Sequence, residues 1–130
     1  MMIYFAIAIG GALGAVARHG SNRFVELVLQ QPLPISTLIV NVFGSFLIGL
    51  VAASFAHYGN PSQEMRLFLT TGFLGGLTTF STFSLDTVTL IQRGEVLFAG
   101  LYVLGSVILS FGALLAALAL VGVLAGKAAS

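Results

Sequence analysis

The chain has no cysteine and no tryptophan, and its 130 residues include only 5 Lys and Arg and 4 Asp and Glu. Without cysteine there is no disulfide, thiolate nucleophile or thiolate metal site. The formal net charge of +1 is too small to favour a nucleic-acid partner. His19 and His57 lie at the ends of apolar segments and lack the spacing of metal ligands. No nucleotide-binding loop is present either, so the sequence argues against most enzyme classes.

Apolar residues are abundant instead: they form 58% of the chain, and charged residues form 7%, against about 25% in soluble domains. A transmembrane helix takes about 20 residues, so four helices nearly fill the chain. No Lys or Arg precedes the first apolar segment, which favours a retained helix over a signal peptide. We expect an all-α integral membrane protein with one domain over residues 1–130, whose spans cover about residues 3–29, 36–58, 63–92 and 96–126.

Residues 72–84 are the most informative segment, because they combine glycines and hydroxyls inside the expected third span. Three glycines, Gly72, Gly75 and Gly76, weaken a helix at this point. Irregular backbone at membrane depth is buried by protein or lines a wet cavity, and ion and substrate sites are commonly built there. The segment therefore predicts a broken third helix and a protein that handles ions.

Several polar side chains fall inside the other spans, where they are candidates for function. Asn41 lies near the start of the second span, and its amide either donates to an ion or joins two helices. Tyr102, Ser106 and Ser110 are four residues apart, so their hydroxyls share one face of the fourth span. Together these groups favour a polar track through the membrane.

Two phenylalanines of the third span, Phe80 and Phe83, share a helical face and either pack or turn their positive ring edges toward an anion. A track without fixed charge attracts a small anion weakly enough to release it. A proton-coupled exporter, the main alternative, requires a carboxylate at mid-span. Asp86 comes closest, about six residues before the end of that span. A non-transporting assembly or insertion factor is the third possibility, and it leaves the broken helix unexplained.

The few charged residues hardly determine which way the chain is oriented in the membrane. With four spans, one side of the membrane carries Arg66 and Lys127, and the other carries Arg18, Arg23 and Arg93. Cytoplasmic loops normally hold an excess of Lys and Arg, and three against two is hardly an excess. The split arises either by chance or from dual topology, in which chains insert both ways and pair antiparallel. Because one subunit is too small to enclose a pore, we favour a homodimer.

The sequence resembles the Fluc (CrcB) family of fluoride channels, and the resemblance covers essentially the whole chain. It rests on three elements: Gly10-Gly11-Ala12-Leu13-Gly14-Ala15 with Arg18, Asn41-Val42-Phe43-Gly44-Ser45-Phe46-Leu47-Ile48-Gly49, and Gly72-Phe73-Leu74-Gly75-Gly76-Leu77-Thr78-Thr79-Phe80-Ser81-Thr82-Phe83-Ser84. The choice of fluoride comes from this resemblance alone. It implies a passive channel in the inner membrane of a bacterium that exports fluoride and lowers its toxicity.

The resemblance further implies an antiparallel, dual-topology homodimer with two fluoride pathways and a structural Na⁺ at its centre. It assigns the Na⁺ to main-chain carbonyls at the break of the third span, by position those of Gly75 and Thr78, and it places Arg18 near the vestibule. The residues it assigns to the fluoride pathway are Asn41, Phe80, Ser81, Thr82, Phe83, Tyr102, Ser106 and Ser110.

Overall fold

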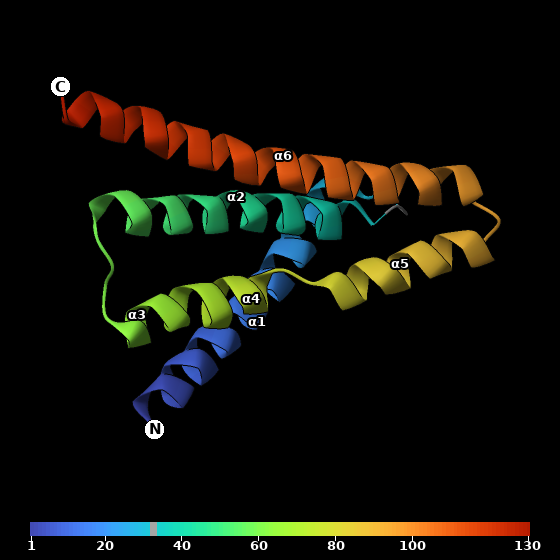
Figure 1. The fold of residues 1–130 in the computed structure, drawn as a ribbon. Coiled ribbons are helices and arrows are strands. Elements are labelled where there is room, and N and C mark those ends of the chain that lie inside the picture. Colours follow the sequence, from blue (N-terminus) through green and yellow to red (C-terminus); the bar gives the residue numbers. More distant parts are fainter. Residues whose placement is uncertain (32–33) are drawn as a thin grey trace.

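The computed structural model describes residues 1–31 and 34–130, and these residues fold into helices joined by short loops (Figure 1). Within these described residues, three helices are long and apolar enough to cross a membrane: α1 (Met2–Leu29), α2 (Ile35–Tyr58) and α6 (Val96–Ala128). The third span consists of shorter pieces, which are α3 (Gln63–Leu67), the π-helix η1 (Phe68–Leu74), α4 (Gly75–Leu77) and α5 (Phe80–Gln92). The all-α fold with a broken third helix is thereby confirmed. Pro32, in the loop expected between the first two spans, lies outside the described residues.

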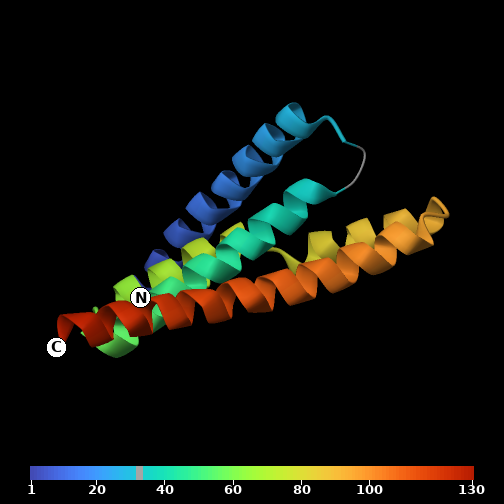
Figure 2. The same ribbon diagram turned by 90° about the horizontal axis from the view of Figure 1, so that it is seen from above.

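The long helices α2 and α6 run side by side, and α1 crosses at an angle against η1 and α4 (Figures 1 and 2). Both chain ends lie at the left of Figure 1, together with the loop from α2 to α3. The turn between α5 and α6 lies at the opposite end. The two chain ends share one end of the molecule because an even number of helical passes, joined by short loops, brings the chain back to the end at which it began.

Glycines allow α1 to approach the third span at backbone distance. A Cβ on Gly10 would lie 2.5 Å from the Phe68 carbonyl oxygen, and one on Gly76 would lie 2.7 Å from the Gly11 carbonyl oxygen. Gly14 is blocked in the same way by the Phe73 carbonyl oxygen. Lipid gives helices no hydrophobic reason to associate, so close backbone packing is a main source of their attraction.

The helix breaks at Thr78 and Thr79, and not at the glycines that precede them. Thr78 and Thr79 are extended, with ψ of 158° and 115°. Gly75 keeps ordinary right-handed helical angles, with φ −65° and ψ −35°. The glycines themselves remain in helical segments, Gly72 in the π-helix η1 and Gly75 and Gly76 in α4, and Gly72 and Gly76 lie against the backbone of α1.

A tight turn returns the chain from α5 to α6. Gly94 has φ +79°, which glycine adopts without a Cβ penalty, and its N–H donates to the Ile91 carbonyl at 2.9 Å. The N–H of Glu95 donates to the Leu90 carbonyl at 2.9 Å. Leu90 is consequently buried against α6, where it packs with Ala99 and Tyr102.

Candidate functional site

A side chain from α2 replaces the missing helical hydrogen bonds at the break. The Asn41 amide donates from Nδ2 to the Thr79 carbonyl at 3.0 Å, and the Thr79 N–H donates to Asn41 Oδ1 at 2.8 Å. In a continuous helix that N–H would bond to the Gly75 carbonyl. Asn41 therefore joins two helices, and one N–H of its amide is left over for another acceptor.

The side chain of Thr79 caps the helix that restarts after the break. Its Oγ1 accepts a hydrogen bond from the Thr82 N–H at 3.1 Å, as an N-cap residue does. In a continuous helix the Thr82 N–H would bond to the Thr78 carbonyl. The carbonyls of Gly75 and Thr78 thus lose their regular donors, which are bound to side chains instead.

A groove of about 440 Å³ lies between α2, the third span and α6. Both halves of the break line it, and so do the facing sides of the two long helices. Among its described lining residues, none carries a charge. Its walls are mostly apolar, with polar groups from Asn41, Ser45, Thr78, Thr79, Ser106 and Ser110.

One hydroxyl in the groove has no hydrogen-bond partner in the described part of the chain. Ser106 is 6% exposed, and its Oγ is buried and unpaired. A buried polar group without a partner costs about 1–3 kcal/mol, so such groups call for an explanation. A small hydrogen-bond acceptor that visits the groove would supply the missing partner.

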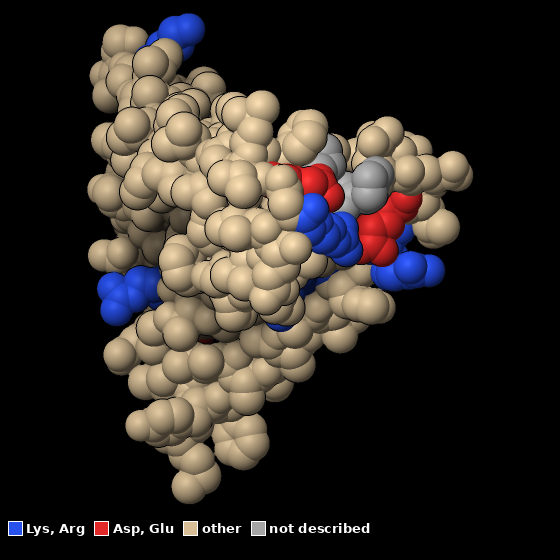
Figure 3. All heavy atoms as spheres, turned by 90° about the vertical axis from the view of Figure 1, so that its right-hand side faces the viewer, with Lys and Arg blue, Asp and Glu red and all other residues tan. Residues whose placement is uncertain are grey.

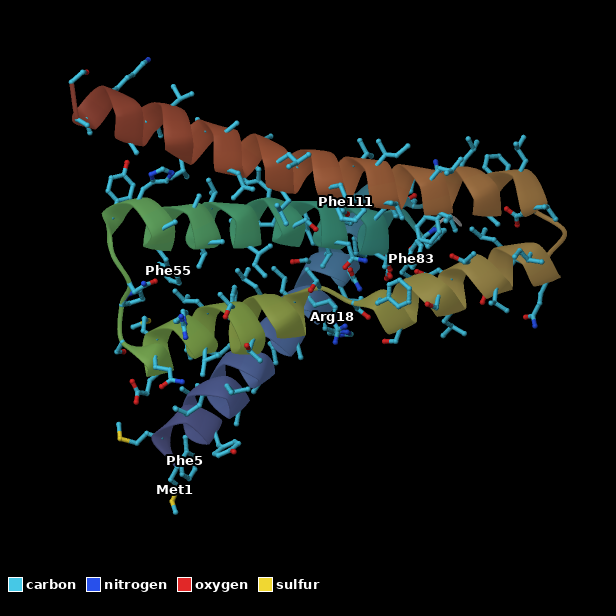
Figure 4. All side chains as sticks on the ribbon, in the orientation of Figure 1. Met1, Phe5, Arg18, Phe55, Phe83 and Phe111 are labelled. Atoms are coloured by element: carbon cyan, nitrogen blue, oxygen red, sulfur yellow. The ribbon has the colours of Figure 1, made fainter. Side chains whose placement is uncertain are left out.

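Three aromatic rings form a series that leads from the surface into the interior. The ring centroids of Phe80 and Phe83 are 5.4 Å apart, and those of Phe83 and Tyr102 are 5.3 Å apart. Phe80 is 79% exposed and Tyr102 is 8% exposed. Figure 4 shows Phe83 on α5 turned toward the space between the third span and the two long helices. The tilted geometry is of the kind that aromatic pairs prefer.

A second, more polar cavity of about 330 Å³ lies on the other side of this aromatic series. Tyr102 reaches toward it and donates its hydroxyl hydrogen to Asp86 Oδ2 at 3.1 Å. Asp86 and Thr82 line this polar cavity, together with residues from the end of α1 and the start of α2. In Figure 3 the acidic side chains and several basic ones gather in one area of the face shown, and separate basic groups lie at its upper and left edges.

The structure brings most, but not all, of the predicted pathway residues together. The groove collects most of them, namely Asn41, Phe80, Phe83, Ser106 and Ser110, and also Gly75 and Thr78. Thr82 lines the polar cavity, Tyr102 lies between the two, and Ser81 is exposed at the start of α5. Arg18 is half-buried in the second half of α1 and is not among the residues that line either cavity.

Two residues of the candidate site were not predicted from the sequence. Thr79 was not assigned, although a threonine directly before an apolar helical segment is a candidate N-cap residue. The hydrogen bond from Tyr102 to Asp86 joins residues 16 positions apart, and their spacing in the sequence does not predict it.

Comparisons with known proteins agree on one family. The model for the family described as "CrcB-like protein, Camphor Resistance (CrcB)" matches residues 5–123. A relative from Rhodopseudomonas palustris (strain BisB5), named "Fluoride-specific ion channel FluC", is 50% identical over 120 residues, which cover 92% of this chain and 97% of the relative. A protein of the same name from Rhizobium etli (strain CIAT 652) is 45% identical over 125 residues, which cover 96% of this chain and all of the relative.

Proposed function

Because the chain belongs to the CrcB family, whose similar members carry the name of fluoride-specific ion channels, we propose that it is a fluoride-selective passive channel. The observation that carries the proposal is the uncharged groove at the helix break. There a buried, unpaired hydroxyl of Ser106 lies near the amide of Asn41 and the rings of Phe80 and Phe83. The family is one of ion channels and not of enzymes, as expected from the sequence.

The groove offers a small anion several weak partners and no strong one. Hydroxyl and amide groups donate hydrogen bonds, and ring edges carry partial positive charge. A fixed positive charge would hold fluoride firmly, whereas conduction needs binding that is weak enough to reverse. We propose that fluoride passes Asn41, Phe80, Phe83, Ser106 and Ser110 in this groove.

The remaining assigned residues extend the same route. Tyr102 adjoins Phe83, and Thr82 lines the polar cavity beyond it, so a path that leaves the groove meets both. Ser81 adjoins Thr82 at the start of α5. We propose that Arg18, as the positively charged group of the vestibule, attracts the anion from solution before it enters.

The working unit is proposed to be an antiparallel homodimer with two pathways. One argument is that the groove is open on the side of Phe80, whose ring is 79% exposed, so a single chain does not enclose it. A second is that three against two Lys and Arg on the two sides favour insertion in both orientations. Two oppositely inserted copies would cover each other's open grooves.

A structural Na⁺ at the break is the proposed cofactor, and the residues fit it. The carbonyls of Gly75 and Thr78 lose their usual donors because Thr79 and Asn41 redirect the amides. Carbonyls at membrane depth need a partner, since water is excluded there. Neutral carbonyl oxygens suit a hard monovalent cation, and none of the described residues that line the groove carries a carboxylate to neutralise a divalent one. When bound, Na⁺ would supply that partner, and this chain's carbonyls would hold it.

Passive export is the physiological role that we propose. Hydrogen fluoride enters a cell from acid surroundings and dissociates inside, where the ion accumulates. A channel in the inner membrane of a bacterium then releases fluoride down its gradient without ATP, which lowers its toxicity.

Reconstituted liposomes test the proposal directly. The purified protein is inserted into vesicles loaded with fluoride or chloride, and the efflux of each ion is measured separately. We expect fast fluoride efflux, no chloride efflux and no dependence on a proton gradient. Flux that requires a proton gradient would instead indicate a proton-coupled exporter, and the absence of any flux would indicate a non-transporting factor.

A further inference from the structure

The amide of Asn41 binds both polar groups of the Thr79 backbone. Its Nδ2 donates to the Thr79 carbonyl at 3.0 Å, and its Oδ1 accepts from the Thr79 N–H at 2.8 Å. The proposed fluoride pathway uses Asn41 only as a donor in the groove. An amide oxygen has no hydrogen to donate, so the pathway gives Oδ1 no role. The bond that Oδ1 makes to Thr79 therefore calls for another explanation.

The Thr79 N–H has two alternative acceptors, and its choice decides whether the third span is broken. In a continuous helix it would donate to the Gly75 carbonyl, four residues earlier. Thr79 instead has extended backbone angles, φ −153° and ψ 115°, and donates to Asn41. The Gly75 carbonyl therefore lacks its helical donor for as long as Asn41 holds the Thr79 N–H.

Loss of the Asn41 oxygen would leave the Thr79 N–H without its partner. An unpaired N–H is costly where water is excluded, so the N–H would be stabilised by returning to the Gly75 carbonyl. That return would rebuild the helix across Thr78 and engage the Gly75 oxygen. The helical hydrogen bond and a cation therefore compete for the same oxygen atom.

We propose that Asn41 is a positioning residue for the cation site: its oxygen holds the Thr79 N–H away from the Gly75 carbonyl and so keeps that carbonyl available to Na⁺. This inference rests on the structural Na⁺ within the proposed function. Asn41 acts on the cation through the Thr79 backbone. Losing the Asn41 oxygen should therefore raise the Na⁺ concentration that the protein needs, in addition to any effect on its stability.

The test follows the midpoint of thermal unfolding in detergent while NaCl replaces the chloride salt of a bulky organic cation at constant ionic strength. Na⁺ begins to raise this midpoint at a concentration near its dissociation constant, which we call the onset concentration. Asn41→Leu removes both hydrogen bonds to Thr79. We expect its onset concentration to rise about tenfold or more, the effect of one buried hydrogen bond.

Three further variants separate the cation site from general stability. Asn41→Asp keeps an oxygen that accepts from the Thr79 N–H, so its onset concentration should not rise. Ser45→Ala is the matched control, because Ser45 lies four residues after Asn41 on α2 and lines the same groove. Its onset concentration should equal that of the parent. Asn41→Ser has a side chain one bond shorter than asparagine, and it should reproduce the higher onset concentration where Asn41→Leu does not fold.

The outcomes distinguish this inference from the proposed function. A lower midpoint in Asn41→Leu at an unchanged onset concentration would mean that Asn41 only joins two helices, and it would overturn the inference. An equal rise in Ser45→Ala or in Asn41→Asp would also overturn it, as would a parent whose midpoint does not respond to Na⁺. Fluoride efflux from liposomes is measured in parallel. A parent that responds to Na⁺ but does not conduct fluoride would overturn the proposed channel function and leave the role of Asn41 at the cation site in place.

Discussion

Among single residues, Phe83 has the most constrained ring in the candidate site. Phe80 lies on one side with its centroid 5.4 Å away, and Tyr102 lies on the other at 5.3 Å. Contacts on both sides fix the direction of the ring edges, which carry the partial positive charge. The ring therefore has a defined orientation toward the groove.

Replacing either phenylalanine by isoleucine tests whether the rings interact with the fluoride ion or only pack against neighbouring side chains. Phe80→Ile and Phe83→Ile keep an apolar side chain but remove the ring edge. We expect fluoride efflux from liposomes to fall about tenfold or more, because no aliphatic group replaces the positive edge. The elution volume of the protein in detergent should not change. Parental efflux in both variants would mean that the rings only pack.

Removing the unpaired hydroxyl of Ser106 should reduce fluoride efflux in part and not abolish it. Ser106→Ala and Ser110→Ala each remove one donor from the groove, and water or a neighbouring group replaces it in part. We expect each variant to lose about two- to tenfold in fluoride efflux. Ser84→Ala is the control, because the Ser84 hydroxyl donates to the Phe80 carbonyl of its own helix at 2.9 Å. Unchanged efflux in Ser106→Ala would remove that hydroxyl from the route.

At the scale of helices, the crossing of α1 with the third span was predictable and the exact break was not. Gly10 and Gly14 are four residues apart, a spacing that predicts close helix contact, and the contact is present. The break depends on Asn41, which is 38 residues from its partner Thr79. Nothing local in the sequence links those two positions. The composition of residues 72–84 therefore indicated a broken helix, and only the fold shows which residues are extended.

A methyl group at the crossing should separate the helices. In Gly14→Ala the added Cβ meets the Phe73 carbonyl oxygen, a backbone atom that has no flexible end to move aside. We expect a loss of about 1–3 kcal/mol of stability, the usual cost of overpacking, and a lower midpoint of thermal unfolding in detergent.

Gly20→Ala on the same helix is the control for this crossing. A Cβ at Gly20 has no neighbouring atom within 4 Å. Its unfolding midpoint should therefore match or exceed that of the parent, since alanine favours a helix over glycine. Equal midpoints for Gly14→Ala and Gly20→Ala would contradict the assigned role of the crossing.

For the molecule as a whole, the proposed dimer would cover the open groove, and the proposed Na⁺ would give the redirected carbonyls a partner. Apolar side chains are exposed along α1 and α6, as expected for helices that face lipid. The carbonyls of Gly75 and Thr78 belong to the proposed dimer centre. If that proposal holds, their role can be measured only in the assembled protein.

Removing Na⁺ tests that role. When Na⁺ is replaced by a bulky organic cation during purification and reconstitution, we expect fluoride efflux to fall and the dimer to dissociate more readily in detergent. Returning Na⁺ should restore both properties, because the cation supplies a partner to buried carbonyls. Radioactive Na⁺ should not cross the vesicle membrane with fluoride. Full fluoride efflux after rigorous depletion of Na⁺ would exclude a structural cation.

The length of α6 has a consequence for the surrounding bilayer. Its 33 residues extend about 50 Å, whereas the 24 residues of α2 extend about 36 Å and the hydrocarbon layer is about 30 Å thick. A helix that exceeds the lipid thickness tilts, kinks or thickens the bilayer around it. In an antiparallel pair the two excess ends would emerge at opposite leaflets, so the hydrophobic mismatch would be shared equally between them. Lipids with longer acyl chains would then relieve the mismatch at both faces of the membrane together.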